Sequence, residues 1–439
     1  MKKINIDSRT LKKGEFFWPI KGENFDGHDF IEKGIKKECS GFVYSEPLDP
    51  SILALAKSKN IQAIKVADTL QALGEEAKKI RQKLNPQIIA ITGSNGKTTT
   101  KEIVGQILAR KYPTVYPQKS FNNLIGLPLT LLSINQDTKY VVLEMGMNQP
   151  GEIRQLMHIA QPDMGVIVNI LNTHIGNFDS QEDIVRAKGE MAENLGQNKT
   201  LILNEDCLQY AFFKQKFACQ IKTFGLNQNN FCILKQARQQ GDKLHVYIIL
   251  NEQTYEFVYP GLGLHNAQNV TGAVACLYEL GLAPEEIQKE LPSITTPYMR
   301  MQKINLNNNI ILYDDTFNAS PASTKAAIDT FDTFVCKGKK YFIFGDMLEL
   351  GKHSPSLHTE IGQQLAKSTI EFIYTYGKET KYTHQVLQNS TKKARHFKNK
   401  TELTQTLKAN LQPNDLLLIK GSKSMKMGEI VLDLRNIFT

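Results

Sequence analysis

The chain has 439 residues, of which 41% are apolar and 22% charged, and this balance is typical of a globular protein. A chain of this length has room for about three domains that each bury a core. The net charge of +9 would suit a nucleic acid, but it suits equally an enzyme whose substrates carry phosphates and carboxylates. Since the lysines are spread along the chain and are not interleaved with aromatic residues, we expect no nucleic-acid partner.

The cysteines and the apolar runs indicate in which compartment the protein is located. The six cysteines are scattered without a C-x-x-C pair, so they indicate neither a zinc site nor a disulfide framework. No apolar segment follows the lysines of the amino terminus, and no apolar run approaches the roughly 18 residues of a membrane-spanning helix. We therefore expect a soluble, cytoplasmic protein that does not insert into a membrane.

Residues 1–85 predict a separate α/β domain, in which short strands near residues 41–44 and 61–66 alternate with helices. Asn85 precedes a proline, which pushes it out of helical conformation and marks the end of this domain. The distinctive residues of the domain are polar, namely Ser8, Arg9, Asp26, Gly27 and His28. Taken singly, each is more typical of a turn than of a ligand site.

The strongest signal lies at residues 88–102, IIAITGSNGKTTTKE, where an apolar strand, a glycine turn and a helix follow one another. Gly93 and Gly96 let backbone N–H groups approach phosphate oxygens, toward which the helix directs its positive end. Lys97 and Thr98 can then meet a nucleotide phosphate and its Mg²⁺. The alternative is an ordinary strand-to-helix turn with a solvated lysine. The pattern is the compressed form of the usual phosphate-binding loop, because an isoleucine replaces its first glycine.

From residue 86 to about residue 295, strands and helices alternate as in a mostly parallel sheet covered on both faces. A strand at 140–143 ends at Glu144, and another at 164–170 leads toward His174. The carboxyl ends of such strands form the edge where α/β sheets bind ligands, and the glycine turn lies on the same edge. Glu144 could hold Mg²⁺ there, or it could simply cap a helix.

Two later features of this region admit more than one interpretation. Lys188 lies on a predicted helix, where its residue type alone indicates a solvated side chain. Asn266 and Asn269 lie about one turn apart and can offer amide groups to a base edge, but they could equally cap and decorate the helix start. Alternating residues at 244–250 and 254–259 predict a hairpin that extends the domain.

Residues 296–439 predict a third α/β unit. A hairpin at 304–306 and 310–313 leads into Asp314 and Asp315. Later strands also end in polar residues, which indicates a second ligand-binding edge.

Together these segments resemble the Mur ligase family, the ATP-dependent enzymes that form amide bonds in the peptide stem of the bacterial cell-wall precursor. The resemblance is carried, in this order, by TGSNGKTTT, SFNNLIGLPLTLL, EMGM, NTHIGNF, AKGEM, HNAQN and KGS. DDTFNASP from Asp314 and GDMLELG from Gly345 look like the branch that joins D-alanyl-D-alanine to UDP-N-acetylmuramoyl-tripeptide. The resemblance implies ligation through an acyl phosphate, with ATP converted to ADP and phosphate, by a protein that acts as a monomer.

The resemblance also implies an architecture. It places a UDP-sugar-binding α/β domain at 1–85, a central P-loop ATPase with a mostly parallel sheet at 86–295, and a Rossmann-like α/β domain at 296–439. The P-loop is the glycine turn at residues 93–96.

Roles for single residues follow from the same resemblance. Lys97 would hold the β- and γ-phosphate oxygens, Thr98 and Glu144 one Mg²⁺, and His174 with a carbamylated Lys188 a second. The nucleotide is implied to contact Gly93, Ser94, Asn95, Gly96, Lys97, Thr98, Thr99, Asn266, Asn269, Arg300, Asp314 and Asp315. The substrates are implied to contact Ser8, Arg9, Asp26, Gly27, His28, Asn122, Asn123, Asn318 and Lys420.

Some positions depart from the family pattern, and other functions remain open. Phe317 stands in place of a tyrosine, Ser320 in place of an asparagine, and Lys423 in place of an arginine. The alternatives are a P-loop motor or nucleic-acid ATPase, a non-catalytic nucleotide-binding scaffold, and a polyglutamate-adding ligase of the same superfamily. Whether the third stem residue of the substrate is lysine or diaminopimelate is not decided by the sequence.

Overall fold

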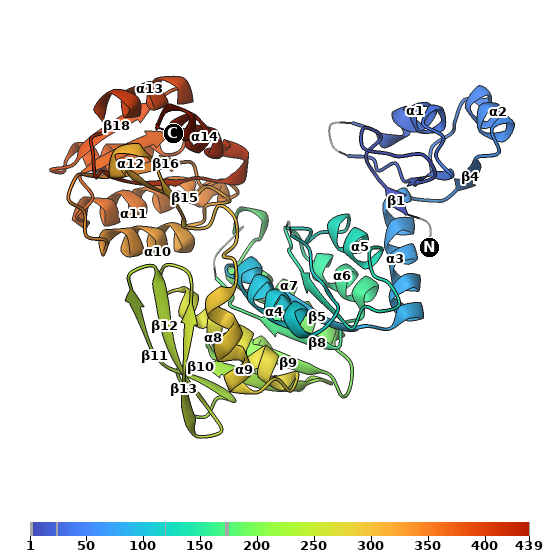
Figure 1. Cartoon of the computed structure of the whole chain (residues 1–439), viewed down its shortest axis with the longest axis horizontal. Coiled ribbons are helices and arrows are strands. Elements are labelled where there is room, and N and C mark those ends of the chain that lie inside the picture. The colour runs from blue at the N-terminus through green and yellow to red at the C-terminus, as the bar shows by residue number, and fades with distance from the viewer. Residues whose placement is uncertain (1–2, 23–24, 119, 172–174, 439) are drawn as a thin grey trace.

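The computed structural model describes residues 3–22, 25–118, 120–171 and 175–438. The described residues form three β-sheets, one in each of three bodies that follow one another along the chain (Figure 1). In Figure 1 the amino-terminal body, in blue, and the carboxy-terminal body, in orange and red, stand apart above the central body. The expected organisation into three α/β units is therefore confirmed.

The amino-terminal sheet is parallel and runs in the order β1-β2-β3-β4. Its strands are β1 (Ile4–Asn5), β2 (Phe16–Phe17), β3 (Gly41–Tyr44) and β4 (Gln62–Lys65), and the helices of this region are α1 (Ile31–Lys36), α2 (Pro50–Ser58) and α3 (Thr69–Leu84). Successive residues of a strand face opposite sides of a sheet, so Phe17 packs with α1 while Phe16 packs on the face covered by α3.

The central sheet runs in the order β13-β12-β11-β10-β9-β8-β5-β7-β6 and is parallel except for the pairs β11 with β12 and β12 with β13. Its strands are β5 (Gln87–Thr92), β6 (Thr114–Val115), β7 (Tyr140–Glu144), β8 (Met164–Ile167), β9 (Thr200–Asn204), β10 (Gln220–Gly225), β11 (Cys232–Gln240), β12 (Lys243–Leu250) and β13 (Gln253–Tyr259). Its helices are α4 (Lys97–Lys111), α5 (Gly126–Leu131), α6 (Glu152–Ala160), α7 (Gln181–Asn194), α8 (Asn266–Glu279) and α9 (Pro284–Glu290).

Strands β5 and β7 are nearly continuous apolar runs because helices bury them on both faces. Ile103 and Val104 of α4 pack with Val270 of α8 on one face of the sheet. The helices α5, α6 and α7 cover the other face, where Leu156 and Val185 are buried. This sandwich holds the ends of β5, β7 and β8 at one edge, next to the start of α4.

One expected element bound is wrong in this body, and one strand was not expected. The strand expected at 164–170 ends at Ile167, because the chain beyond it turns toward the P-loop. The expected hairpin is present as β12 and β13, but β11 also pairs with β12, which the sequence did not predict. In strand β11 only Cys232 and Leu234, near its start, are buried, and the second half is made mostly of polar residues, so the sequence shows no alternation of apolar and polar residues there.

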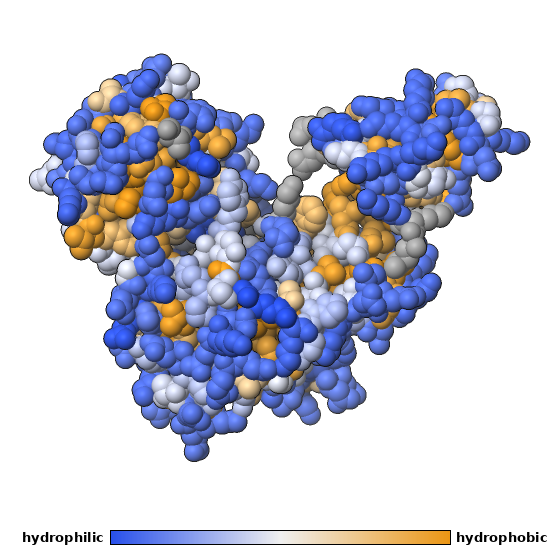
Figure 2. Space-filling view, in the orientation of Figure 1, coloured by the Kyte–Doolittle hydropathy of each residue, from blue (hydrophilic) through white to orange (hydrophobic). Residues whose placement is uncertain are grey.

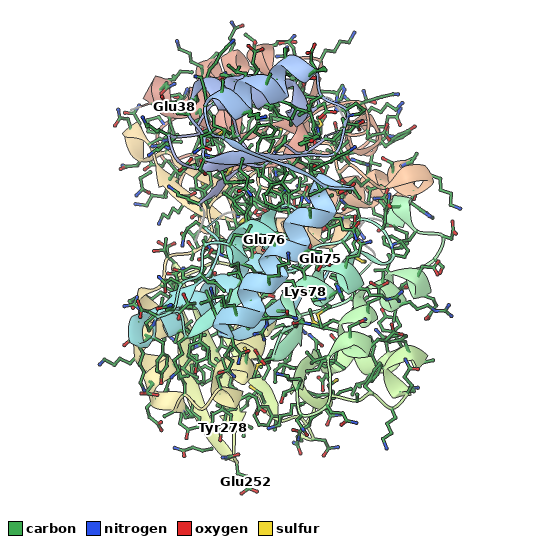
Figure 3. All side chains as sticks on the ribbon, turned by 90° about the vertical axis from the view of Figure 1, so that its right-hand side faces the viewer. Glu38, Glu75, Glu76, Lys78, Glu252 and Tyr278 are labelled. Carbon is green, nitrogen blue, oxygen red and sulfur yellow. The ribbon has the colours of Figure 1, made fainter. Side chains whose placement is uncertain are left out.

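Helix α3 joins the amino-terminal body to the central one. Near its start Leu73 packs on the amino-terminal sheet, whereas Ala77 is buried in the core of the central body. Arg81 is also buried, and its Nε donates to the carbonyl oxygen of Ala160 at the end of α6, 3.0 Å away. Figure 3 shows the outer side of α3, which carries Glu76 and Lys78. The helix therefore belongs by its packing to both bodies.

The carboxy-terminal sheet runs in the order β14-β15-β19-β16-β17-β18, with only β14 antiparallel to its neighbour among the described strands. Its strands are β14 (Gln302–Asn305), β15 (Ile311–Asp315), β16 (Lys340–Gly345), β17 (Phe372–Tyr376), β18 (Lys393–Phe397) and β19 (Leu416–Lys420). Its helices are α10 (Pro321–Asp332), α11 (Ser354–Lys367), α12 (Lys381–Gln388), α13 (Lys400–Asn410) and α14 (Gly428–Phe438). Strand β19 comes late in the chain but inserts between β15 and β16, which pairs Lys420 with Asp315.

Candidate active site

A cavity of about 860 Å³ opens between the central and carboxy-terminal bodies. Figure 2 shows the molecule hollowed between its outer bodies, above the central one. The cavity is lined by the P-loop, by Glu144 and Lys188 of the central body, and by Asp315 and Lys420 of the carboxy-terminal body. It therefore collects side chains from segments far apart in the sequence.

The P-loop joins β5 to α4 in a conformation that only glycine tolerates well. Gly96 has φ of +81° and directly precedes the first residue of α4. A Cβ atom at Gly96 would also collide with the side chain of Asn269. The strand, the glycines and the helix thus stand in the order that the sequence predicts. The first turn of α4, whose N–H groups have no partner within the helix, lines the cavity.

Lys97 lies folded over this loop. Its Nζ donates to the carbonyl oxygens of Gly93 and Ser94, at 2.6 and 3.2 Å. Burial lowers the pKa of Lys97, and the nearby carboxylate of Glu144 opposes this shift. The ammonium is therefore held beside the cavity by weak acceptors that phosphate oxygens could replace.

Thr98 and Glu144 form a pair of oxygen groups next to it. The hydroxyl of Thr98 donates to Oε2 of Glu144 at 2.9 Å, and Nδ2 of Asn122 donates to Oε1 at 2.8 Å. Glu144 is only 2% exposed. Among the described residues both of its carboxylate oxygens bond to side chains, and the start of α4 beside it has no side-chain cap, so the interpretation of Glu144 as a helix cap is wrong. A hydroxyl and a carboxylate are oxygen donors of the kind that Mg²⁺ accepts.

Lys188 is buried in α7, with 2% of its surface exposed, and it lines the cavity. Burial, reinforced by the charge of Lys97, sets the pKa of Lys188 well below its usual range. Among the residues that the structure describes, none forms a hydrogen bond or an ion pair with its ammonium. The interpretation of Lys188 as a solvated lysine is therefore wrong. His174, the metal ligand predicted beside it, lies outside the described residues.

The asparagines of α8 and of the 120–123 segment are ordered by local hydrogen bonds. Nδ2 of Asn269 donates to Oδ1 of Asn266 at 2.8 Å, and Nδ2 of Asn266 donates to the carbonyl oxygen of Leu262 at 2.7 Å. Asn123 accepts the N–H of Gly126 at 2.9 Å. Both asparagines of α8 and Asn123 line the cavity. The residue that caps α8 is His265, without a side-chain hydrogen bond, and a contact of Asn266 and Asn269 with a base stays a prediction.

The carboxy-terminal body contributes a second set of charged groups. Nζ of Lys420 donates to Oδ2 of Asp315 at 2.5 Å and to the carbonyl oxygen of Asn318 at 3.0 Å. The guanidinium of Arg300 lies 4.4 Å from the centre of the Phe317 ring. The missing tyrosine hydroxyl is not needed for this contact, because the ring face alone attracts the cation.

Asp314 is not brought to the cavity. It adjoins Asp315 on β15, and neighbouring residues of a strand point to opposite faces, so Asp314 lines a separate cavity of about 230 Å³. Its Oδ1 accepts both the N–H and the hydroxyl of Thr316, at 3.0 and 2.7 Å. The structure thus separates the two aspartates that the sequence placed together in the nucleotide site.

The predicted substrate residues of the amino-terminal body lie away from this cavity. His28 is buried; its Nε2 accepts the N–H of Ser45 at 3.1 Å, so its Nδ1 donates to Asp26 at 2.6 Å. Gly27 leaves no room for a Cβ atom, since that atom would lie 2.6 Å from the nitrogen of Ile20. Ser8 is buried, and Arg9 extends outward to pair with its neighbour Asp7, so the structure groups Asp26, Gly27 and His28 but does not add Ser8 and Arg9 to that group.

The sequence analysis did not single out Asn169, which lines the cavity and bonds to the P-loop. The one available signal was a polar side chain at the end of an apolar run, and it was hidden inside the strand expected at 164–170. Within the described ranges no helix has the length and apolar character needed to cross a membrane.

Comparison with known proteins agrees with this geometry. Residues 1–81 match the model "Mur ligase family, catalytic domain", residues 91–277 "Mur ligase middle domain", and residues 299–423 "Mur ligase, glutamate ligase domain". The UDP-N-acetylmuramoyl-tripeptide–D-alanyl-D-alanine ligase of Bacillus subtilis is 37% identical over 437 residues, which cover 98% of this chain and 92% of that protein. The ligase of the same name from Haemophilus influenzae is 30% identical, with 99% and 94% covered.

The solved structures give the same result. A crystal structure of MurF from Acinetobacter baumannii matches with a TM-score of 0.87 and 29% identity, covering 99% of this chain and 93% of that one. A structure of MurF from Thermotoga maritima in complex with ADP, 23% identical, shares the fold with a TM-score of 0.85 and covers 99% of this chain and 97% of its own. By sequence and by fold over nearly its whole length, the chain belongs to the Mur ligase family.

Proposed function

We propose that this chain is an ATP-dependent ligase that adds D-alanyl-D-alanine to UDP-N-acetylmuramoyl-tripeptide during peptidoglycan synthesis. The observation that supports this best is the near full-length similarity to ligases of that name, combined with a cavity where P-loop, carboxylates and lysines meet. The DDTFNASP segment contributes Asp315 and Asn318 to the same cavity.

The chemistry requires activation, because a carboxylate and an amine do not condense in water. An oxygen of the terminal carboxylate of the tripeptide attacks the γ-phosphorus of ATP, and the bond from that phosphorus to the β,γ-bridging oxygen breaks to release ADP. The amine nitrogen of D-alanyl-D-alanine then attacks the acyl carbon. The C–O bond to phosphate breaks, inorganic phosphate leaves, and the nitrogen loses a proton as the amide forms.

Positioning and charge neutralisation dominate such a transfer, so cations rather than a covalent nucleophile carry it. Lys97 would exchange its two loop carbonyls for β- and γ-phosphate oxygens. Arg300 would add a second cation beside the phosphates. Its Nη2 donates to the hydroxyl of Thr98 at 3.0 Å, while its buried Nε has no acceptor among the described residues. An unpaired buried donor beside the P-loop fits an anionic ligand there. Lys420, held by Asp315, would face the incoming dipeptide from the other body.

The residues also fit Mg²⁺. Thr98 and Glu144 would hold one ion, which neutralises charge on the phosphates when bound. Within the described residues no group of three or more His, Cys, Asp or Glu side chains is arranged so that it could hold a metal ion. A Mg²⁺ site does not need such a group, because the ion usually keeps several waters and binds through only one or two carboxylates plus substrate phosphates.

The second ion proposed at Lys188 and His174 needs a modified lysine, since an ammonium cannot ligate a cation. The lowered pKa of Lys188 favours the free amine, which is the form that adds CO₂ and releases a proton to give a carbamate. A carbamate supplies the oxygen donors that Mg²⁺ takes. Burial without a described counter-charge is the feature of Lys188 that supports this proposal.

The remaining parts of the proposal concern the whole chain. The amino-terminal domain, residues 1–85, would bind the UDP-sugar precursor through Asp26, Gly27 and His28, with Ser8 and Arg9 as further contacts. The domain limits would fall after residues 85 and 295, with α3 packed against both neighbours. Since ATP and the UDP precursor are cytoplasmic metabolites, we propose that the enzyme acts in the cytoplasm. We also propose that it acts as a monomer.

A direct assay separates this function from its rivals. The purified chain is incubated with Mg²⁺, ATP, the tripeptide precursor and D-alanyl-D-alanine, and products are identified by mass spectrometry together with released phosphate. We expect one dipeptide added per phosphate, and no product when either substrate is omitted or when L-alanyl-L-alanine replaces the dipeptide. Addition of glutamate in place of the dipeptide would favour the polyglutamate-adding ligase, and phosphate release stimulated by nucleic acid would favour the motor.

A further inference from the structure

Asn169 lies just beyond the end of β8 and reaches sideways to the P-loop. Its Nδ2 donates to the carbonyl oxygen of Asn95 at 3.1 Å, and its Oδ1 accepts the N–H of Asn95 at 3.0 Å. One side-chain amide therefore satisfies both backbone groups of a single loop residue.

The backbone of residues 169–171 also forms hydrogen bonds with Ser94 of the loop. The carbonyl oxygen of Asn169 accepts the N–H of Ser94 at 3.0 Å. The hydroxyl of Ser94 donates to the carbonyl oxygen of Leu171 at 2.9 Å, and the N–H of Leu171 donates to that hydroxyl at 2.8 Å. Gly93 permits this approach, since a Cβ atom there would lie 3.2 Å from the nitrogen of Asn169.

This pairing decides which loop groups remain for a phosphate. The N–H groups of Ser94 and Asn95 already donate to Asn169. The N–H groups at the start of α4 and the ammonium of Lys97 are left, beyond the left-handed Gly96. An amide that pairs with both backbone groups of Asn95 fixes the plane of the adjoining peptides, as a ladder pair does in a sheet.

We infer that Asn169 is a positioning residue for the nucleotide phosphates, which holds the P-loop in its binding conformation before the nucleotide arrives. It touches no reacting atom and acts through the peptide of Asn95. Preordering of this kind removes part of the ordering cost of binding. The inference rests on the proposed ATP site.

The carboxamide of Asn169 donates one hydrogen bond to Asn95 and accepts one from it, and this permits a test by pH. Asn169→Asp keeps the shape, but a carboxylate only accepts, so it would repel the carbonyl oxygen of Asn95. A protonated carboxyl has a donor and an acceptor again. Affinity for nucleotide should therefore return in this variant as the pH falls through the pKa of the new carboxyl.

The experiment measures Mg²⁺-ADP binding to the full chain by calorimetry between pH 5 and pH 8, with every variant compared to wild type at the same pH. We expect Asn169→Ala to bind roughly tenfold more weakly at all pH values, since it loses two hydrogen bonds. Asn169→Asp should be the weaker of the two at pH 8 and should recover toward wild type at pH 5.

Asn204→Ala is the matched control for general damage. Asn204 donates from Nδ2 to the carbonyl oxygen of Val168 at 2.9 Å, one residue before Asn169, and is fully buried. It should lower the melting temperature without producing the pH-dependent recovery. Wild-type affinity of Asn169→Asp at pH 8 would overturn the inference, even if Asn169→Ala does not fold. Wild-type protein that binds no ADP would instead overturn the proposed function.

Discussion

Arg300 donates from Nη2 to the hydroxyl of Thr98 across 3.0 Å and so ties the segment between the central and carboxy-terminal bodies to the first turn of the P-loop helix. The same guanidinium lies over the ring of Phe317 from the carboxy-terminal body. Met299 and Met301, on either side of Arg300, both have positive φ, at 58° and 48°. Left-handed backbone at two non-glycine residues is strained and persists only where its surroundings hold it. Arg300 is thus one contact through which the carboxy-terminal body reaches the phosphate site, and the hydroxyl of Ser320, which donates to Oδ1 of Asn95 at 3.4 Å, is another.

Arg300→Lys tests this contact. Lysine keeps the charge but loses the planar group that stacks on Phe317 while it bonds to Thr98. We expect kcat/KM for ligation to fall by about 10- to 100-fold, as misplacement at an active site does, with the fold intact. Phe317→Tyr, which keeps the ring face, should retain activity, whereas Phe317→Leu should lose roughly fivefold. Equal activity of Phe317→Leu and wild type would show that the stacking has no role.

Lys97→Ala should abolish most ligation without unfolding the chain. The change removes the ammonium that lies over the P-loop, and loss of one stabilising donor typically costs about 10²- to 10³-fold in kcat. Steady-state kinetics and circular dichroism together make the measurement. Lys111→Ala, at the exposed end of the same helix, is the matched control and should leave kcat unchanged. A folded Lys97→Ala protein with the wild-type rate would refute the P-loop assignment.

Lys188→Ala should be nearly inactive yet as stable as wild type. A lysine buried without a described partner contributes little to stability, but its carbamate would supply an oxygen donor to Mg²⁺ during phosphoryl transfer. Added acetate should restore part of the turnover, because it can bring a carboxylate into the gap.

The control for Lys188 is Arg186→Ala, an exposed residue of the same helix, which should be neutral both with and without acetate. High-resolution density from crystals grown with bicarbonate should show a planar extension beyond Nζ of Lys188. A bare ammonium in such crystals, together with full activity of Lys188→Ala, would rule out the carbamate.

Acid should destabilise the carboxy-terminal body through His358. Nε2 of His358 accepts the N–H of Met347 at 3.1 Å, and Nδ1 donates to the carbonyl oxygen of Ser354 at 2.8 Å. Burial lowers the pKa of His358, while that carbonyl and two nearby carboxylates oppose the shift. As the pH falls, the unfolded chain therefore binds the proton first, at the ordinary histidine pKa of about 6.5. The stabilising contribution is present above that pH and is lost as the pH drops toward the folded pKa.

Urea denaturation between pH 5 and pH 8 checks this sign. We expect the free energy of unfolding of wild type to fall with acid, and we expect the fall to be smaller in His358→Gln, which cannot titrate. His353→Gln, which changes a half-buried histidine on the turn before α11, is the control for removing a histidine from the same region. A difference between wild type and His358→Gln that does not change with pH would contradict the assignment.

Local signals in the sequence predicted much of the nucleotide site. The strand, glycine turn and helix around Lys97 follow one another along the chain, so the period of apolar residues and the φ requirement of Gly96 were both visible. Glu144 was found for a similar reason, because a polar residue at the end of a buried parallel strand faces the ligand edge.

Other parts depend on contacts that no local pattern reveals. Asp314 and Asp315 are neighbours, and only the placement of β15 in its sheet tells which one faces the cavity. Asn169 bonds to Asn95 across 74 positions of sequence, and Arg300 meets Thr98 across 202, so both contacts exist only once β8 and the carboxy-terminal body are in place. The buried state of Lys188 likewise follows from the packing of α7 rather than from its residue type.

The central claim, amide ligation through an acyl phosphate, is tested most directly by oxygen transfer. Tripeptide precursor labelled with ¹⁸O in its terminal carboxylate is converted with ATP and D-alanyl-D-alanine, and the released phosphate is analysed by mass spectrometry. Because the attacking carboxylate oxygen stays on phosphorus when the amine displaces phosphate, each phosphate should carry one ¹⁸O atom, and the amide product should lack one. Unlabelled phosphate formed together with product would contradict the account.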